Sequence, residues 1–272
     1  FHVPVARPSV WLDASDDPNP ITFNNLEQVI KTVHDQGGHT HIWIWGDAQR
    51  GWTPPGGINS QKHKRFQRYL AARLGPLPGW SAGLGFDLDE WVTESELHSW
   101  RDFLQGKMGW FHFLGGRPAG PNSGTDHSPW NSWNSGVEYS SYEHHEPNYD
   151  VYRAAITEVE GQPVMSEDRL IVTDGGAGKY YTDEQTRRGL YISTMAGGVA
   201  NIWGNLNTGS YPDGSGPYPN KEELKTYSNF FFNKDRFLAD MQASTSITDG
   251  RALVDGSSEN YVFYKKNASS IQ

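Results

Sequence analysis

The chain contains no cysteine among its 272 residues, which excludes disulfide bonds, thiolate zinc sites and a cysteine nucleophile. It also has no run of about 18 apolar residues, the length that a membrane-spanning helix needs, so we expect no membrane partner. Lysine and arginine never form a run longer than a pair, and the formal net charge is −9. Because phosphate binding needs a concentrated basic face, we expect no nucleic-acid partner.

Neither a serine-hydrolase nor a dinucleotide-binding motif stands in the context that its chemistry needs. The segment Gly79-Trp-Ser-Ala-Gly83 fits G-x-S-x-G, but Ser81 begins an expected strand and does not lie on a strand-to-helix turn, so the sequence does not indicate a serine hydrolase. No G-x-G-x-x-G turn follows an early strand-like run, which weighs against a doubly wound dinucleotide-binding sheet, the alternative fold.

The chain is rich in aromatic residues, with 11 tryptophans and 13 tyrosines, and 36% of its residues are hydrophobic. This is enough to build a sizeable core and to leave some aromatic rings for a binding cleft. For any single ring, core packing and ligand stacking are about equally consistent with the sequence.

Strand-like runs alternate with helical patterns along most of the chain, which is typical of βα units around a parallel sheet. The expected strands are 8–12, 39–45, 81–88, 110–114, 136–142, 163–166 and 199–203. The expected helices are 23–36, 60–74, 94–105, 148–159 and 183–195, and the third opens with a capping-box pattern at 93–96. Seven strands are one short of a closed barrel. We therefore predict an α/β fold, a (β/α)8 TIM-type barrel whose first strand would precede Phe1.

The pattern changes near the C-terminus. After an amphipathic segment at 221–242, short alternating runs at 251–254 and 261–265 predict a β-hairpin. Because two strands alone are marginal, the tail is either the start of a truncated β-sandwich domain or an edge that packs on the barrel. We predict a catalytic barrel domain at 1–243 and a β tail at 244–272.

Carboxylates end two of the expected strands. Asp87, Asp89 and Glu90 end the third, and Glu167 ends the sixth. Barrel enzymes place their chemistry at the carboxyl ends of the strands, and a pair of carboxylates is the minimal apparatus for cleaving a glycosidic bond. These acids are therefore the candidate catalytic residues.

Other side chains near the same strand ends are candidates for binding substrate. Tryptophan rings can stack on the flat C–H faces of sugars, and polar side chains can hydrogen-bond the hydroxyl groups. The candidates are Trp43, Trp45, Asp89, Trp91, His112, Trp133, Trp203 and Asn205.

A metal-dependent hydrolase is the main alternative. His39 and His41 are two residues apart, which in a strand places both imidazoles on one face, and His112 and the pair at 144–145 could add ligands. The pair lies at the amino end of its expected strand, the opposite rim from a barrel's active site.

Three segments resemble the apiosidase-like barrel glycosidases of the large retaining clan, which often carry a collagen-binding-type β domain at their C-terminus. They are Leu84-Gly-Phe-Asp87, Pro163-Val-Met-Ser-Glu167 and the block that runs from Arg187 through Thr194-Met-Ala-Gly-Gly to Gly204. The resemblance implies that Asp87 is the general acid/base and Glu167 the nucleophile. Phe86 replaces a glycine of the pattern, and Glu90 lies where it could take the acid/base role instead.

We therefore expect hydrolysis of a poly- or oligosaccharide with retention of configuration, without metal or other cofactor. The expected partner is the carbohydrate alone, and the expected protein is a secreted or periplasmic monomer. A polysaccharide lyase and a carbohydrate-binding protein that has lost catalysis remain alternatives.

Overall fold

The computed structural model describes residues 2–3, 16–46, 53–85, 87–117, 136–143, 148–158, 161–169, 183–198, 200–203, 221–232, 238–244, 246, 251–257 and 260–265. The chain divides into two units, of which the first comprises residues 1–120 with 128–142 and the second residues 121–127 with 143–272. Each unit is described by itself.

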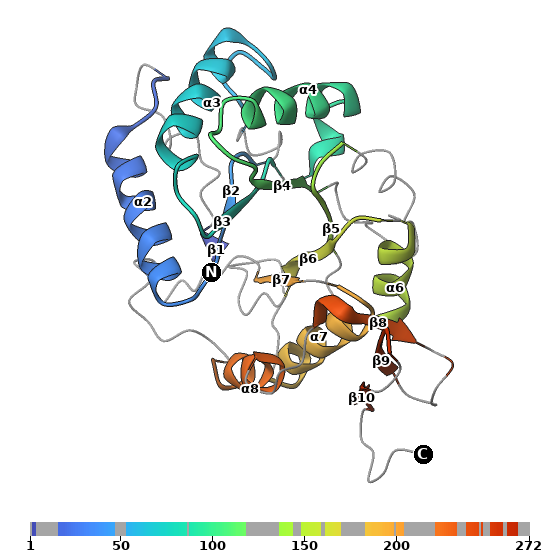
Figure 1. Ribbon diagram of the computed structural model, residues 1–272. Coiled ribbons are helices and arrows are strands. Elements are labelled where there is room, and N and C mark those ends of the chain that lie inside the picture. Colours follow the sequence, from blue (N-terminus) through green and yellow to red (C-terminus); the bar gives the residue numbers. More distant parts are fainter. Residues whose placement is uncertain are drawn as a thin grey trace. The chain divides into compact units, whose positions relative to one another are not determined.

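The first unit is built on parallel strands that follow one another in chain order and curl together (Figure 1). In register, His41 of the second strand pairs with His2 and Ser81, and Ala82 of the third pairs with Leu114. The strands are β1 (His2–Val3), β2 (Thr40–Trp43), β3 (Trp80–Gly83), β4 (Phe113–Gly116) and β5 (Tyr139–Glu143). Their common direction brings the carboxyl ends of β2, β3 and β4 to one rim.

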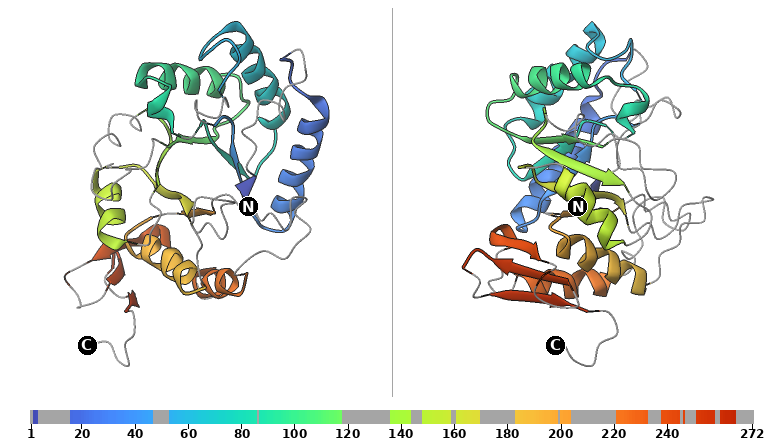
Figure 2. Two further views of the ribbon diagram at one scale, coloured as in Figure 1. Left: turned by 180° about the vertical axis from the view of Figure 1, so that it is seen from behind. Right: turned by 90° about the vertical axis from the view of Figure 1, so that its right-hand side faces the viewer.

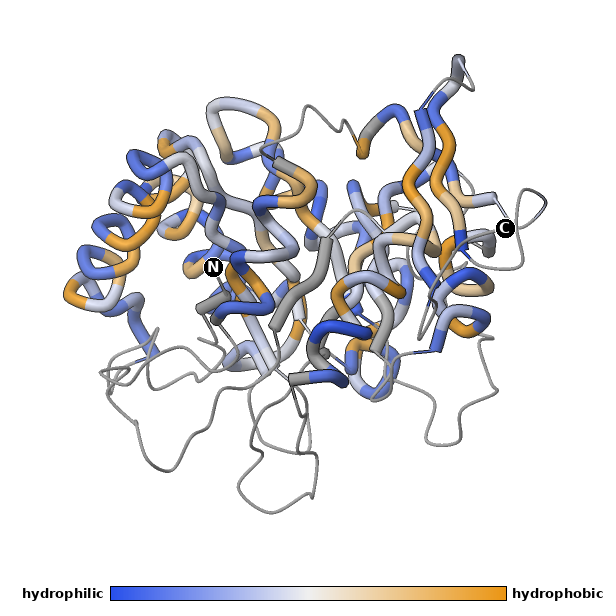
Figure 3. Tube along the Cα trace, turned by 90° about the horizontal axis from the view of Figure 1, so that it is seen from below, coloured by the Kyte–Doolittle hydropathy of each residue, from blue (hydrophilic) through white to orange (hydrophobic). Residues whose placement is uncertain are grey.

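Three helices cover the outside of this curled sheet: α2 (Pro20–Asp35), α3 (Gln61–Leu74) and α4 (Glu94–Gln105). Each begins at a polar side chain that accepts a hydrogen bond from a backbone N–H of the first turn: Asn19, Ser60 and Thr93. Hydrophobic and hydrophilic residues alternate along the helical turns (Figure 3), as expected for helices with one buried face.

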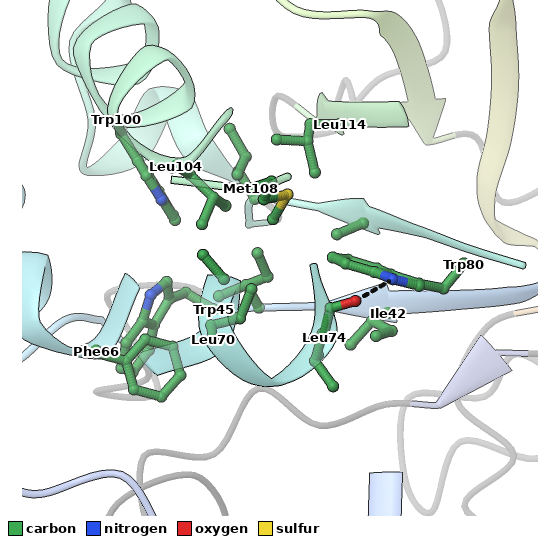
Figure 4. Packing of buried hydrophobic residues seen from close by; sticks show 14 of the residues in the cluster. Ile42, Trp45, Phe66, Leu70, Leu74, Trp80, Trp100, Leu104, Met108 and Leu114 are labelled. Carbon is green, nitrogen blue, oxygen red and sulfur yellow. Dashed lines mark hydrogen bonds between the residues drawn. The ribbon is translucent and has the colours of Figure 1, made fainter. Parts of the chain in front are cut away.

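The core of the first unit lies between these helices and the outward face of the strands. Figure 4 shows Trp45 beside Phe66 of α3, and Trp80 with its indole N–H donating to the carbonyl of Leu74 at 3.0 Å. All four side chains are at most 3% exposed. Burial of several large rings in one layer supplies much of the hydrophobic stabilisation of this unit.

The second unit continues the alternation of helices and strands (Figure 2). Strands β6 (Val164–Arg169) and β7 (Ala200–Trp203) form a parallel pair, with Met165 opposite Ala200 and a register shift between Ser166 and Arg169. The helices are α6 (Tyr149–Glu158), α7 (Asp183–Met195) and α8 (Lys221–Phe232).

A separate antiparallel sheet of three strands closes the second unit, in the order β10-β9-β8. The strands are β8 (Met241–Ser244), β9 (Arg251–Asp255) and β10 (Tyr261–Tyr264). The sheet packs on the helices of this unit, because the Arg251 guanidinium lies 4.0 Å from the centre of the Tyr149 ring and Tyr264 stacks on Tyr191. The predicted hairpin is confirmed, and it gains a third strand.

Most predicted elements are confirmed. The helices at 94–105 and 183–195 have the predicted ends, and the capping box between Thr93 and Glu96 is present. The prediction of one continuous amphipathic segment at 221–242 was wrong, because α8 ends at Phe232 and β8 begins at Met241. The expected first strand at 8–12 lies outside the described residues, and the strand that precedes β2 and pairs with it is β1 at 2–3. The predicted domain boundary at 243/244 falls inside β8 and stays a prediction. In the described part of the chain, no helix has the length and apolarity that crossing a membrane requires.

Candidate active site

The carboxyl ends of β3 and β4 carry the charged groups of the candidate site. After β3 ends at Gly83, the chain continues through Leu84 and Gly85 to Asp87, and after β4 ends at Gly116 the next residue is Arg117. Leu84 N–H donates to the carbonyl of Gly115 at 2.7 Å, so the two strand ends remain side by side beyond the sheet. This is the rim at which barrels of this kind do their chemistry.

Asp87 occupies a left-handed backbone conformation, with φ 52° and ψ 42°. Such a conformation is uncommon outside glycine, although aspartate tolerates it better than most residues. It turns the chain directly into the short 3-10 helix η1 (Leu88–Glu90), whose first residue, Leu88, is buried. Asp89 and Glu90 are exposed on this helix, so the three predicted acids lie together in one turn at the rim.

The side chain of Arg117 is the buried partner of Asp87. Its Nη2 lies 2.8 Å from Oδ1 of Asp87, and the two side chains are 3% and 20% exposed. The guanidinium also lies over the ring of Trp43, 5.6 Å from the ring centre. Arg117 was not predicted as a site residue, because the expected strand ended at Leu114 and residue 117 therefore did not fall at a strand end.

Trp43 lies at the predicted rim but is not an open stacking platform. It is 4% exposed, Arg117 covers its ring, and its carbon atoms approach the backbone of Gly83 so closely that a Cβ there would be 2.8 Å away. A sugar could not reach this ring as it stands. The expectation that Trp43 binds substrate by stacking is therefore corrected: its buried ring packs against the guanidinium of Arg117.

The prediction that Trp45 binds substrate is also corrected. Its side chain is fully buried, 5.0 Å from the ring centre of Phe66 and 6.0 Å from that of His63. Both neighbours belong to α3, so Trp45 lies in the helix-facing core and offers no ring face to a sugar.

His112 lies at the wrong rim for a substrate-binding role. Strand β4 begins only at Phe113, so His112 precedes the amino end of the strand, and its ring packs 4.4 Å from that of Trp80. Burial lowers the pKa of His112. A neutral imidazole accepts from the indole N–H of Trp110, 2.8 Å away. This expectation is corrected to a structural role.

Among the described residues, the histidine pair predicted for a metal site gathers no further ligands, and the pair at 144–145 lies outside those residues. His39 Nε2 and His41 Nδ1 lie 2.9 and 2.8 Å from the same atom, Oγ of Ser81, and His41 Nε2 lies 3.2 Å from the hydroxyl of Tyr139. Across the described ranges, no group of three or more potential metal-ligating residues comes together. His41 belongs to the packed interior of the curled sheet, whereas His39 is exposed just before β2 begins.

The remaining site residues divide into those that the structure describes and those that it does not. Trp91 is partly buried, with its ring centre 6.3 Å from that of Trp100, and stays a candidate together with the exposed Asp89. Glu167 lies in β6 directly after the buried Ser166, but its side chain and that of Trp203 are outside what the structure describes. Trp133 and Asn205 also lie outside the described residues.

Comparison with known proteins adds to this geometry. Neither a protein-family model nor a curated protein matches the sequence. Among solved structures, a candidate glycoside hydrolase from Bacteroides vulgatus superposes with a TM-score of 0.67 at 12% identity, over 89% of this chain and 48% of the other. A glycoside hydrolase family 5 protein from the same organism gives 0.60 at 14% identity, over 85% and 58%. The endo-1,4-β-mannanase of Thermotoga petrophila gives 0.54 at 13% identity, over 80% and 82%.

The fold is the α/β, TIM-barrel type of these glycoside hydrolases. The chain spans about half to three fifths of the length of the two Bacteroides proteins. At these identities the likeness shows the fold alone. The narrower resemblance to apiosidase-like enzymes and to their C-terminal β domain stays a prediction.

Proposed function

We propose that this protein is a glycoside hydrolase that cleaves a poly- or oligosaccharide by a retaining mechanism with two carboxylates. The observation that carries the proposal is the acidic turn at the end of β3, where Asp87, Asp89 and Glu90 lie at the catalytic rim of a fold that glycoside hydrolases use. Glu167 lies in β6, the third strand after β3 in chain order.

The chemistry requires one acid to attack and one to move a proton. Glu167 would attack the anomeric carbon while Asp87 or Glu90 protonates the leaving oxygen, and the C–O bond breaks as the glycosyl-enzyme bond forms. The same acid/base then removes a proton from water, which attacks the anomeric carbon and releases Glu167. A retaining pair works at a separation of about 5–5.5 Å between carboxyl groups.

Substrate binding would fall to the remaining candidates around this rim. The exposed carboxylate of Asp89 can accept hydrogen bonds from sugar hydroxyls. Trp91, Trp133 and Trp203 are proposed to stack on sugar rings, and Asn205 to hydrogen-bond hydroxyl groups. A secreted or periplasmic location would give such an enzyme access to polysaccharides and forms part of the same proposal.

A screen of plant and algal polysaccharides tests the proposal. The wild type should release new reducing ends from at least one of them, and the release should persist in the presence of a metal chelator. Glu167→Gln should abolish the release, because the amide cannot act as the nucleophile. The matched control is Glu222→Gln, since the side chain of Glu222 is 70% exposed on α8.

Three results would contradict the proposal. Full activity of Glu167→Gln would remove Glu167 from the mechanism. An unsaturated, ultraviolet-absorbing product would indicate a lyase. Binding of a polysaccharide by the wild type without any turnover would indicate a carbohydrate-binding protein.

A further inference from the structure

Arg117 makes three separate contacts with the turn that carries the acids. Its backbone N–H donates to the carbonyl of Gly85 at 3.3 Å, and its carbonyl accepts from the N–H of Leu88 at 3.0 Å. Its guanidinium donates to Oδ1 of Asp87 at 2.8 Å. Arg117, the residue that follows β4, therefore contacts the backbone before and after Asp87 and also the side chain of Asp87.

The buried guanidinium of Arg117 favours the ionised form of its partner. A guanidinium stays protonated in proteins, and one that is 2% exposed needs a nearby anion to offset the loss of its hydration. Asp87 supplies an anion at charge-assisted hydrogen-bonding distance. An opposite charge at such a distance favours the ionised form of a carboxyl group.

A carboxylate whose ionised form is stabilised by an ion pair is a poor proton donor. The acid/base of a retaining glycosidase must carry a proton when the leaving group departs and lose it only then. Glu90 belongs to the same turn, is exposed, and follows Asp87 by three residues. The turn thus carries Asp87 in an ion pair with Arg117 and, three residues later, the exposed Glu90.

We infer that Asp87 and Arg117 form a positioning ion pair that fixes the acidic turn, and that Glu90 is the proton donor. This inference rests on the proposed function. Glu90 gives its proton to the glycosidic oxygen as Glu167 bonds to the anomeric carbon, and the Glu90 carboxylate then takes a proton from the attacking water. Arg117 and Asp87 act on the reaction only through the placement of Glu90.

The test compares Glu90→Gln with Asp87→Asn on two kinds of substrate. One is the polysaccharide found in the screen, and the other is a 2,4-dinitrophenyl glycoside of its sugar, whose leaving group departs without protonation. Glu90→Gln should lose about 100- to 10,000-fold in kcat/KM on the polysaccharide, the usual range for an acid/base. It should still release dinitrophenolate from the dinitrophenyl glycoside by breaking the bond between the anomeric carbon and the glycosidic oxygen. It should also lose the basic limb of its pH profile and regain turnover when azide is added.

Asp87→Asn and Arg117→Lys should behave differently. Both should keep the basic limb of the pH profile and show no azide rescue, while their unfolding midpoints fall, less for Arg117→Lys because lysine retains the charge. Asp102→Asn is the matched control, since its side chain is 69% exposed on α4. Retention of the basic limb by Glu90→Gln, or azide rescue of Asp87→Asn, would overturn the inference.

The outcomes separate this inference from the proposed function. Full activity of Glu167→Gln, or no cleavage of any substrate by the wild type, contradicts the hydrolase proposal itself. A different result contradicts only the assignment of Glu90. In that case the wild type is active and Glu167→Gln is inactive, but Glu90→Gln has the same pH profile as the wild type. Because Glu90 is exposed, Glu90→Gln is expected to fold, so it tests the inference even where Asp87→Asn does not fold.

Discussion

Replacing Trp45 by phenylalanine separates a core role from a substrate-binding role for this ring. Trp45 is fully buried against Phe66 and His63 of α3. In the described part of the structure its indole N–H is buried and has no hydrogen-bond acceptor. Phenylalanine keeps an aromatic ring at this place and removes the unsatisfied donor.

The two effects of Trp45→Phe oppose each other. A smaller ring leaves a cavity of about 40 Å³, which at about 24 cal/mol per Å³ costs about 1 kcal/mol, and some transfer free energy is lost as well. Removing a buried donor that lacks a partner recovers about 1–3 kcal/mol. The expected change in the free energy of unfolding is therefore within about 1 kcal/mol of zero, whereas Trp45→Ala should lose about 3–5 kcal/mol.

Urea unfolding of the three proteins, with KM measured on the polysaccharide substrate, checks this reasoning. Trp45→Phe should have a KM within about twofold of the wild type, because the ring touches only core residues. A loss of stability in Trp45→Phe as large as in Trp45→Ala would refute the energetic reasoning. A KM raised by about tenfold or more, with stability unchanged, would return Trp45 to the substrate-binding residues.

Three further predictions concern packing and pH. Gly115→Ala should lower the free energy of unfolding by about 1–3 kcal/mol in urea titrations, because the new Cβ would lie 2.3 Å from the buried Tyr139 ring; unchanged stability would mean that this ring can move aside. Burial, with a smaller effect of a neighbouring lysine, lowers the pKa of His63 to about 3. Between about pH 6.5 and pH 3 the unfolded chain therefore binds a proton at His63 that the folded chain does not bind. As the pH is lowered through this range, the His63 contribution to the free energy of unfolding should fall by about 1.4 kcal/mol per pH unit. A pH series of unfolding curves should show this slope in the wild type and its loss in His63→Leu. Thr93→Ala should cost about 1 kcal/mol through the lost cap. Hydrogen bonds from Thr93 lower the pKa of Glu96, so the thermal-unfolding difference between this variant and the wild type should narrow as pH falls below about 4.5; a constant difference would contradict the coupling.

The helices were predictable because their signals are local. The helix of α4 begins after a threonine with a glutamate three residues on, and its apolar residues recur at helical spacing, so both ends follow from the sequence. The placement of the acids was also predictable in part, because a carboxylate that follows a strand of a parallel barrel lies at one known rim.

The side to which Trp45 points was not predictable, because it depends on a break in strand alternation. Trp43 and Trp45 should share a face by the period of two. However, the consecutive N–H groups of Ile44 and Trp45 donate to the consecutive carbonyls of Gly83 and Leu84. A regular parallel strand directs only every second N–H to one neighbour. This irregularity puts Ile44 and Trp45 together into the helix-facing core.

The ion pair between Asp87 and Arg117 could not be predicted from the sequence for a different reason. Arg117 is 30 residues away in the chain, and only the parallel pairing of β3 with β4 brings it beside the acidic turn. The tail was predicted as strands, but the role of β8 depended on where α8 ends, and no glycine or proline signal marks that point in the stretch 221–242.

Trapping of the glycosyl-enzyme decides whether Glu167 is the nucleophile. The wild type would be incubated with the 2-deoxy-2-fluoro 2,4-dinitrophenyl glycoside of the sugar identified in the screen, and the labelled peptide would be located by mass spectrometry. We expect one added glycosyl group per chain, on Glu167, and none in Glu167→Gln. A label on another residue, or release of product with inverted configuration, would contradict it.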